Sequence, residues 1–264
     1  MKNVTFVIPA YNEEKNIGTL LNEIQELYPN SPIIVINNNS TDNTCEIAEK
    51  FGVLILSERK QGKGNAIKTG FKAVKTEYAV MLDADNTYSP NEAKQLVEPL
   101  IKNKCDVVMG SRLNKNKENG AITRLNIIGN HILSLVASIL YLRISDVCTG
   151  YWAFKKEVID FLLEKGISSS GFELEAEMFI KVSKGNFRVK EIPIEYKKRS
   201  DIAKLNSVKD GWQIFRTLLV FRFVSNDQKN EEIIQDSDSA PRPPYMFSFL
   251  LLVIYMGYLI DLIF

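Results

Sequence analysis

The sequence predicts an α/β fold in which a mostly parallel sheet is flanked by helices. Short apolar runs typical of buried strands alternate with segments whose apolar residues recur at helical spacing. From residue 4 to residue 56 the order is strand, helix, strand, helix, strand, which predicts parallel strands with right-handed crossovers. Polar residues follow several of these strands. Open α/β sheets bind ligands along that edge, so we expect a ligand site at the carboxyl ends of the strands.

The first elements are defined by apolar runs and by the polar residues between them. In order, we expect a strand at Val4–Ile8, a helix with apolar positions from Ile17 to Leu27, a strand at Ile33–Ile36, a short helix through Ile47, Ala48 and Phe51, and a strand at Val53–Leu56. Ser40 or Thr41 can cap the second helix, and Gly52 can end it. The polar run Asn37–Asp42 therefore lies where the second strand ends.

The segment Lys60–Gly70 has the composition of a phosphate-binding loop that opens a helix. Gly62 and Gly64 allow close approach of the backbone, and Lys63 offers a point charge to a phosphate. It is not a P-loop, because the spacing Gly-x-x-x-x-Gly-Lys-Ser/Thr is absent.

Two carboxylates follow the apolar strand expected at Tyr78–Leu82. Asp83 and Asp85 are separated by the small Ala84, and alternate residues of an extended segment point the same way. Their convergence suits Mg²⁺ or Mn²⁺, hard cations that fill their remaining positions with substrate phosphate and water. A solvated turn is the alternative, since Asp and Asn are common where strands end.

The sheet is expected to gain further strands from the middle of the chain. A helix at about Pro90–Lys102 precedes a strand at Asp106–Gly110. Arg112 comes directly after that strand, where it is either a phosphate clamp or an exposed arginine. The extended run Val189–Tyr196 contains Pro193 and is typical of an edge strand.

Two later helices have long apolar surfaces. In Arg124–Arg143, polar residues repeat every fourth position and leave a narrow polar stripe: Asn126, Asn130, Ser134 and Ser138. Ser207–Phe223 repeats the theme, with apolar and aromatic residues among basic ones. Such amphipathic helices either lie at a membrane interface or pack on each other in the core.

The C-terminal part differs in composition from the rest. Residues 225–244 are polar and acidic, as in a linker, and Met246–Phe264 is almost wholly apolar. At about 1.5 Å per residue this run is just long enough to cross a bilayer core of roughly 30 Å. We expect a transmembrane anchor rather than a core helix, and no signal peptide, because Lys2-Asn3 leads directly into the first strand. The expected division is a domain at 1–223 with halves 1–112 and 113–223, a linker at 224–244 and an anchor at 245–264.

Composition argues against several classes of function. The 264 residues carry a formal net charge of +1, which provides no general field for nucleic acid, so phosphate recognition must be local. The single histidine, His131, and three cysteines without paired spacing argue against a zinc site and a Ser-His-Asp triad. The odd number of cysteines fits reduced thiols in a cytosolic compartment.

Eight short motifs are spread over residues 4–205. They read Val7-Ile-Pro-Ala-Tyr-Asn-Glu-Glu14, Asn37-Asn-Asn-Ser-Thr-Asp42, Gly62-Lys-Gly64, Asp83-Ala-Asp85, Gly110-Ser-Arg112, Asp146-Val-Cys-Thr-Gly-Tyr151, Phe172-Glu-Leu-Glu175 and Arg199 to Leu205. In this order and spacing they resemble the family 2 glycosyltransferases of the GT-A fold, and within them the dolichyl-phosphate and polyprenyl-phosphate sugar synthases.

The resemblance implies roles for particular residues. The implied nucleoside contacts are Pro9, Tyr11, Glu13, Asn37 and Asn38; the metal ligands are Asp83 and Asp85; the phosphate contacts are Arg112, Arg124, Arg199 and Lys204. The family usually has aspartates in place of Asn37 and Asn38, so the identity of the base is left open. The stretch Arg199–Leu205 also departs from the family pattern, because it lacks the glycine and shifts the serine.

The implied reaction is metal-dependent, inverting transfer of a sugar from a nucleotide-sugar, with UDP favoured, to a polyprenyl or dolichyl phosphate at the cytoplasmic membrane face. Alternatives are a GDP-mannose-using dolichyl-phosphate mannose synthase and a transferase that extends a lipid-linked saccharide. A phosphate acceptor needs no strong base. A sugar hydroxyl would need one, and Asp146 is then the candidate, although Asp146 can equally order its loop. The paired Asp83 and Asp85 argue against a non-catalytic nucleotide-sugar-binding membrane protein.

Overall fold

The strands form where the sequence has short apolar runs, and they lie in one seven-stranded sheet. The computed structural model describes residues 1–113, 118–199 and 206–234. Its strands are β1 (Val4–Ala10), β2 (Ile33–Asn37), β3 (Leu54–Ser57), β4 (Tyr78–Met81), β5 (Val107–Ser111), β6 (Trp152–Lys155) and β7 (Val189–Pro193), in the order β3-β2-β1-β4-β6-β5-β7.

The sheet is mostly parallel, as predicted, and helices connect its first four strands. β1 pairs in parallel with β2 and with β4, and β2 pairs in parallel with β3. β7 pairs in parallel with β5 at the end of the sheet, which confirms the edge strand expected around Pro193. The carboxyl ends of β1, β2 and β4 therefore meet along one edge.

β6 departs from the parallel order and was not predicted from the sequence. It is inserted antiparallel between β4 and β5. Trp152 and Phe154 are fully buried and stack at 5.5 Å, and the Trp152 indole N–H donates to Thr149 O at 2.6 Å. Because β6 runs the other way, the loop before it lies at the carboxyl ends of β4 and β5. The topology thereby brings the Asp146–Tyr151 motif to the site.

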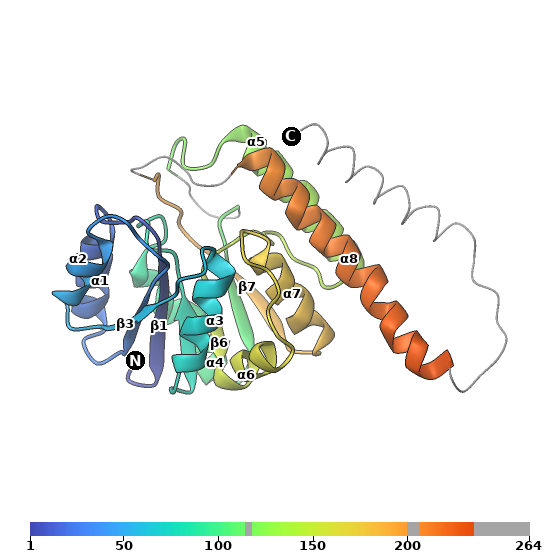
Figure 1. Cartoon of the computed structure of the whole chain (residues 1–264), viewed down its shortest axis with the longest axis horizontal. Helices are drawn as coiled ribbons and strands as arrows, with labels where there is room; N and C mark the ends of the chain where they lie inside the picture. Colours follow the sequence, from blue (N-terminus) through green and yellow to red (C-terminus); the bar gives the residue numbers. More distant parts are fainter. Residues whose placement is uncertain (114–117, 200–205, 235–264) are drawn as a thin grey trace.

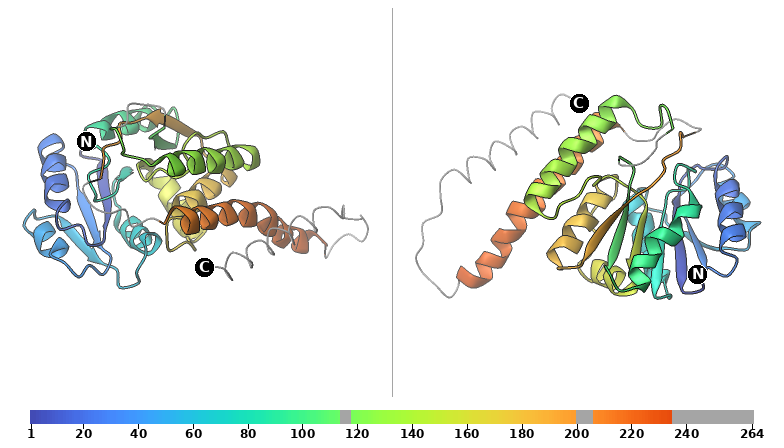
Figure 2. Two further views of the ribbon diagram at one scale, coloured as in Figure 1. Left: turned by 90° about the horizontal axis from the view of Figure 1, so that it is seen from above. Right: turned by 180° about the vertical axis from the view of Figure 1, so that it is seen from behind.

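Helices cover both faces of the sheet (Figures 1 and 2). They are α1 (Ile17–Leu27), α2 (Thr44–Glu49), α3 (Lys63–Ala73), α4 (Ala93–Ile101) after a 3₁₀ turn η1 (Pro90–Glu92), α5 (Arg124–Leu140), α6 (Lys156–Glu164), α7 (Leu174–Lys184) and α8 (Ser207–Ile234). Side chains of α1 and α4 bury one face of the sheet, and side chains of α3, α6 and α7 bury the other.

The amphipathicity of α5 is inverted relative to that of an ordinary surface helix. Its polar stripe faces the protein: Asn130 and Ser134 are buried, and the Ser134 hydroxyl accepts from Val147 N at 3.0 Å. The opposite side carries an exposed apolar row, in which every side chain is more than half exposed: Leu125, Ile128, Ile132, Leu135 and Ile139. α8 runs beside α5 (Figures 1 and 2), so the two helices pack on each other as well as carrying exposed apolar surface.

α8 is longer than the sequence suggested. It continues from Phe223 to Ile234, so the first part of the expected linker is helical. Residues 225–234 contain no Gly or Pro, and their Gln, Lys and Glu residues are good helix formers, so nothing stops the helix at Phe223. The expected anchor at 245–264 lies outside the described residues. Across residues 1–113, 118–199 and 206–234, no helix is both long and apolar enough to span a membrane.

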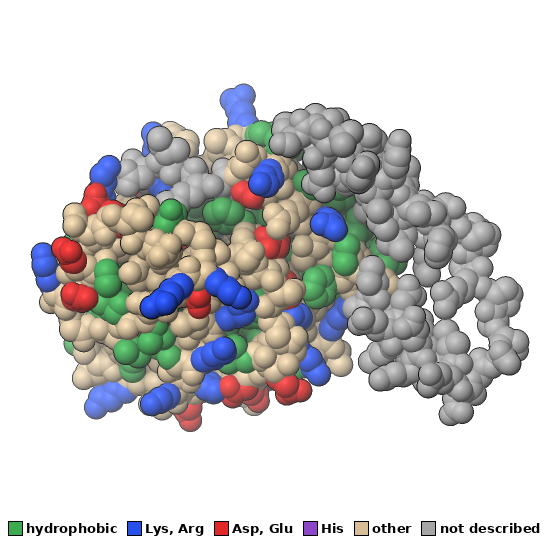
Figure 3. Space-filling view, viewed as in Figure 1, with side chains coloured by type: hydrophobic (Ala, Val, Ile, Leu, Met, Phe, Trp, Pro, Cys, Tyr) green, Lys and Arg blue, Asp and Glu red, His purple; other side chains and the backbone are tan. Residues whose placement is uncertain are grey.

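Charges of both signs lie on the face shown in Figure 3. On this face, lysines and arginines lie among acidic side chains instead of forming one basic patch. Any recognition of phosphate on this side of the protein must therefore come from a few positioned cations, in keeping with the net charge of +1.

Candidate active site

The residues that follow β1, β2 and β4 line a cavity of about 270 Å³, here called the donor cavity. Its walls include most of the residues expected to hold a nucleotide-sugar: Pro9, Tyr11, Glu13, Asn38, Lys63, Asp83, Asp85 and Arg199. These residues come from distant parts of the sequence. The sheet collects most of them because they lie at or just beyond the carboxyl end of a strand or at the start of a helix, and Arg199 reaches them from the segment after β7.

Asn37 and Asn38 organise the loops at the end of β2. The Asn38 amide is buried; it donates to Lys60 O at 2.7 Å and accepts from Gly62 N at 2.7 Å. Asn37 accepts from Ser40 N at 3.0 Å. Asn38 thus fixes the Gly62 loop against the donor cavity, while Asn37 shapes the turn after β2.

Asp83 and Asp85 both reach the donor cavity from the end of β4. Asp85 Oδ1 accepts hydrogen bonds from the backbone N–H of Thr87 at 3.1 Å and from its hydroxyl at 2.6 Å. These bonds orient the carboxylate and leave Oδ2 for another partner. Burial and the neighbouring Asp83 charge raise the pKa of Asp85 above its ordinary value, which is the expected effect of two carboxylates sharing one small site.

A protein cation contacts each of these carboxylates. Lys63 Nζ lies 2.5 Å from Asp83 Oδ1 and 2.6 Å from Glu175 Oε1. Arg199 places Nη1 3.0 Å from Asp85 Oδ2 and Nη2 2.6 Å from Glu13 Oε1. Burial alone would lower the pKa of Lys63, but the two carboxylates outweigh it and hold that pKa above its ordinary value. Lys63 is therefore a permanent cation in the floor of the cavity.

A second cavity, here called the acceptor cavity, also measures about 270 Å³ and adjoins the first. The two cavities share Lys63, Asp83, Asp85, Phe172 and Arg199. The acceptor cavity continues between α5 and α8, where its apolar lining includes Leu125, Leu133, Val208 and Ile214. It therefore joins a charged end to an apolar end.

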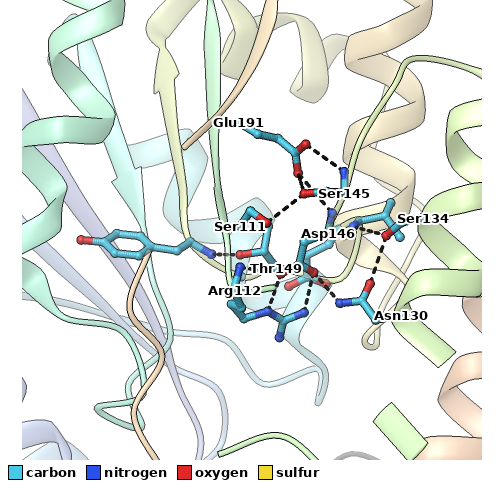
Figure 4. Close-up of polar contacts among 12 residues, drawn as sticks. Ser111, Arg112, Asn130, Ser134, Ser145, Asp146, Thr149 and Glu191 are labelled. Carbon is cyan, nitrogen blue, oxygen red and sulfur yellow. Dashed lines mark hydrogen bonds and ion pairs between the residues drawn. The ribbon is translucent and has the colours of Figure 1, made fainter. Parts of the chain in front are cut away.

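Arg112 lies in the wall of the acceptor cavity and is held there by Asp146 (Figure 4). Its guanidinium donates from Nε to Asp146 Oδ2 at 2.8 Å and from Nη2 to Oδ1 at 2.7 Å, and its backbone N–H donates to Oδ2 at 2.9 Å. The ring of Tyr196 lies under the guanidinium, 5.4 Å from Arg112 Cζ. Arg112 is thus a fixed cation beside the charged end of the acceptor cavity.

The geometry of Asp146 does not suit a general base. The side chain is fully buried and accepts four hydrogen bonds, three from Arg112 and one from Asn130 Nδ2 at 2.6 Å. Burial alone would raise the pKa of Asp146, but the Arg112 charge and these hydrogen bonds hold it below its ordinary value. The loop around it is fixed in turn, because Glu191 accepts from the N–H groups of Ser145 and Asp146. Of the two readings of Asp146, this arrangement favours the one in which it orders its surroundings.

One of the predicted phosphate contacts, Arg124, is not brought into the cavities. Arg124 is exposed at the start of α5 and does not line either cavity. Lys204 lies outside the described residues.

Two contributors had no role assigned from the sequence. Glu175 belongs to the Phe172–Glu175 motif, but only the fold shows that its carboxylate meets Lys63. Tyr88 is buried, lines the acceptor cavity and accepts from Gly150 N at 2.8 Å. Tyr88 follows Asp85 by three residues, and this closeness in sequence was the available signal that it lies at the site.

The donor set fits a divalent cation of the Mg²⁺ or Mn²⁺ type. Among the described residues, no group of three or more His, Cys, Asp or Glu side chains is arranged to hold a metal ion. Asp83 and Asp85 both line the donor cavity, so their carboxylates would supply hard oxygen ligands to such an ion, and substrate phosphate and water the rest.

The sequence of this chain is similar to those of several known proteins. The family model described as Glycosyl transferase family 2 matches residues 5–163. A dolichyl-phosphate hexose transferase from Haloferax volcanii is 30% identical over 218 residues, covering 82% of this chain and 92% of that protein. A UDP-N-acetylglucosamine–dolichyl-phosphate N-acetylglucosaminyltransferase from Methanococcus voltae is 29% identical over 246 residues, covering 84% of this chain and 96% of that protein.

The fold is also shared with a solved structure. Glucosyl-3-phosphoglycerate synthase from Mycobacterium tuberculosis, in complex with Mn²⁺, UDP and phosphoglyceric acid, superposes with a TM-score of 0.67 at 20% identity, covering 83% of this chain and 78% of that one. This likeness shows the GT-A-type α/β fold. With a family match that spans more than half of its residues, the chain belongs to glycosyl transferase family 2 and is a glycosyltransferase.

Proposed function

We propose that this glycosyltransferase moves a sugar from a nucleotide-sugar, with a UDP-sugar as the favoured donor, to a polyprenyl or dolichyl phosphate, with inversion at the anomeric carbon. One observation carries the proposal. Two cavities meet at Lys63, Asp83, Asp85 and Arg199, and the second continues into an apolar space between α5 and α8. This arrangement has room for a donor diphosphate on one side and for a phosphate with an apolar chain on the other.

The relatives support both substrates. The names of the Haloferax and Methanococcus proteins each give dolichyl phosphate, and the second names a UDP-sugar donor. The Mycobacterium structure holds UDP with Mn²⁺. In this chain, the side-chain amide of Asn38 is engaged with Lys60 and Gly62, so it does not by itself select a base. A GDP-sugar therefore stays the alternative donor, to be separated by assay.

The chemistry follows from the positions of the cations. A phosphate monoester is already anionic near neutral pH, so its oxygen can attack the anomeric carbon without a strong base. Arg112, Arg199 and Lys63 would neutralise the acceptor phosphate and the departing diphosphate. A Mg²⁺ or Mn²⁺ ion held by Asp83 and Asp85 would add positive charge to the leaving group.

Extension of a lipid-linked saccharide is the competing reaction, and it requires a general base in the site. A sugar hydroxyl must lose a proton as it attacks, and the candidate base was Asp146. All four hydrogen bonds to Asp146 come from Arg112 and Asn130, which leaves its carboxylate committed to them. This commitment favours a phosphate acceptor.

We further propose that the protein works at the cytoplasmic face of a membrane. The apolar row of α5 exposes five large side chains on one side of the molecule. An exposed apolar helix face of this kind is typical of an interaction with another apolar phase. A C-terminal anchor at 245–264 would hold this face at the surface where a lipid phosphate resides.

The proposed function is tested with membranes that contain the full chain. A panel of radiolabelled UDP- and GDP-sugars is supplied with a polyprenyl phosphate and with a lipid-linked saccharide, and the lipid products are identified by mass. We expect one sugar to be transferred to the polyprenyl phosphate in the presence of Mg²⁺ or Mn²⁺. Labelling of the lipid-linked saccharide alone would contradict the proposed acceptor.

Arg199 provides a first prediction. Arg199→Ala is expected to lower kcat/KM by about tenfold or more, corresponding to at least about 1.4 kcal/mol, because the guanidinium lies where the two cavities meet. Arg199→Lys should recover only part of the loss, since an ammonium cannot bind phosphate in a bidentate manner. Kinetics with each variant check both statements. A change within error for Arg199→Ala would show that Arg199 does not contact the substrate phosphates during transfer.

The C-terminal residues and the apolar row provide a second prediction. Removal of residues 235–264 should leave transfer to a short, soluble prenyl phosphate intact and should reduce binding to lipid vesicles, because anchoring only raises local concentration. The remaining vesicle binding should fall further with Ile128→Asp, measured by flotation. Ile101→Asp on α4 is the matched control, since Ile101 is 58% exposed and Ile128 is 59% exposed. Loss of activity toward the soluble acceptor would place the removed segment in the site.

A further inference from the structure

Lys63 and Glu175 form a buried ion pair. The proposed reaction gives a role to Lys63 but none to Glu175. Lys63 is the first residue of α3, and Glu175 is the second residue of α7. The Lys63 side chain is 14% exposed and that of Glu175 is 4% exposed. A phosphate-binding lysine at a cavity wall does not require a buried carboxylate behind it. Phosphate binding by Lys63 therefore does not account for the buried carboxylate of Glu175.

The surroundings of the pair are tightly built. Gly62, before Lys63, has φ +126°, and a Cβ there would lie 2.2 Å from Ser170 O, so the start of α3 is pressed against the loop that leads to α7. A Cβ on Gly150 would lie 2.6 Å from Asp83 Oδ2 and 2.9 Å from Lys63 Nζ. Gly62 and Gly150 thus allow close approach of the backbone on two sides of Lys63, which lies between two carboxylates.

The positions of the charges show what this pairing does. Lys63 Nζ lies 2.5 Å from Asp83 Oδ1, so a divalent cation that binds this oxygen must compete with the ammonium group. If Asp83 were the only partner of Lys63, release of Asp83 would leave a buried unpaired cation, which costs several kcal/mol. Glu175 lies 2.6 Å from the same ammonium and can keep it paired.

We propose that Glu175 is a positioning residue that retains Lys63 while Lys63 yields Asp83 to the divalent cation, so that Lys63 becomes free to contact the donor diphosphate without leaving the cavity. This inference rests on the proposed metal and donor sites. It makes the Lys63 ammonium a tethered competitor of the metal ion, and it makes the binding of metal and of diphosphate mutually dependent.

The inference is tested by Mn²⁺ binding to the full-length protein, measured by electron paramagnetic resonance with and without UDP. For wild type we expect UDP to tighten Mn²⁺ binding. Glu175→Gln should weaken Mn²⁺ binding by about tenfold, or about 1.4 kcal/mol, because Lys63 is left with Asp83 alone. Adding Lys63→Met should restore the Mn²⁺ affinity, since the competitor is gone, but should abolish the tightening by UDP.

Glu177→Gln is the matched control. Glu177 lies on the same helix, is buried and is paired with a lysine, Lys181, but it lines neither cavity. This variant should bind Mn²⁺ as wild type does. Circular dichroism and Tm identify any variant that fails to fold. If Glu175→Gln does not fold, the Mn²⁺ affinity of the double variant with Lys63→Met still tests the inference. The double variant should fold because a neutral pair of similar volume replaces the ion pair.

The outcomes separate this inference from the proposed function. Wild-type Mn²⁺ affinity in Glu175→Gln would overturn the inference alone, and so would an equally weakened double variant, because Glu175 would then not act through Lys63. Full tightening by UDP in the double variant would overturn the role of Lys63 toward the diphosphate. Absence of Mn²⁺ binding by wild type with UDP present would overturn the proposed metal site together with the inference.

Discussion

Asp83→Asn and Asp85→Asn are each expected to lower kcat by about a thousandfold or more, which corresponds to about 4 kcal/mol of transition-state stabilisation. Each substitution removes a negative charge from the small site where the divalent cation would bind, while leaving the shape of the side chain. The fold should persist, because Asp83 is 28% exposed at a strand end and the amide oxygen of Asp85→Asn can still accept from Thr87.

The measurement is sugar transfer as a function of Mg²⁺ or Mn²⁺ concentration, with a chelator as the zero point. Asp160→Asn is the control, since Asp160 is a half-exposed carboxylate on α6 that also pairs with a lysine. It should retain wild-type kcat and Tm. Full activity of either site variant in an assay insensitive to chelator would rule out the metal role of that residue.

The location of this site was predictable because it depends on local pattern and on one general rule of topology. Asp83 and Asp85 follow an apolar strand, and Lys63 opens a helix after a glycine. In a parallel sheet such positions share one edge, so recognition of the βαβαβ order was sufficient to bring them together. The edge strand at Pro193 was predictable for a similar local reason, since proline cannot donate to a sheet ladder.

The antiparallel strand β6 was not predictable from its own residues. Trp152–Lys155 is a short apolar segment, and short apolar segments carry no information on strand direction. Its place between β4 and β5 depends on pairing with strands that are more than 40 residues away in sequence. The partners of Asp146, which lies in the loop before β6, depend on that placement, so they could be identified only from the fold.

The orientation of α5 shows the same limit in a helix. Periodicity located a narrow polar stripe, and an ordinary surface helix would turn that stripe to solvent. Here Asn130 and Ser134 satisfy Asp146 and the N–H of Val147, so the stripe faces inward and the apolar row faces outward. The polar stripe could be found in the sequence, but the buried partners of Asn130 and Ser134 could be identified only from the fold.

Substitution of Asp146 is expected to lower the stability of the folded protein strongly. Asp146→Ala should lower the free energy of unfolding by about 3–5 kcal/mol, because it leaves the buried Arg112 guanidinium without its carboxylate and also removes the partner of Asn130. Asp146→Asn should cost less, since an amide oxygen can still accept from part of this network. Urea denaturation of both variants checks the order.

The pH dependence of that stability distinguishes a charged pair from simple packing. Arg112 and the hydrogen bonds hold the pKa of Asp146 below its ordinary value, although burial opposes them, so the folded state favours the ionised form. Its stabilisation is therefore complete above about pH 4, where an unfolded aspartate is ionised, and is lost as pH falls through the depressed folded pKa. The difference in stability between wild type and Asp146→Asn should be greatest near neutral pH and should shrink in acid.

In kinetics, Asp146→Asn should raise KM for the acceptor more than it lowers kcat, because it loosens Arg112 without removing it. A variant as stable as wild type at pH 7, with unchanged KM, would show that Asp146 does not hold Arg112 in place.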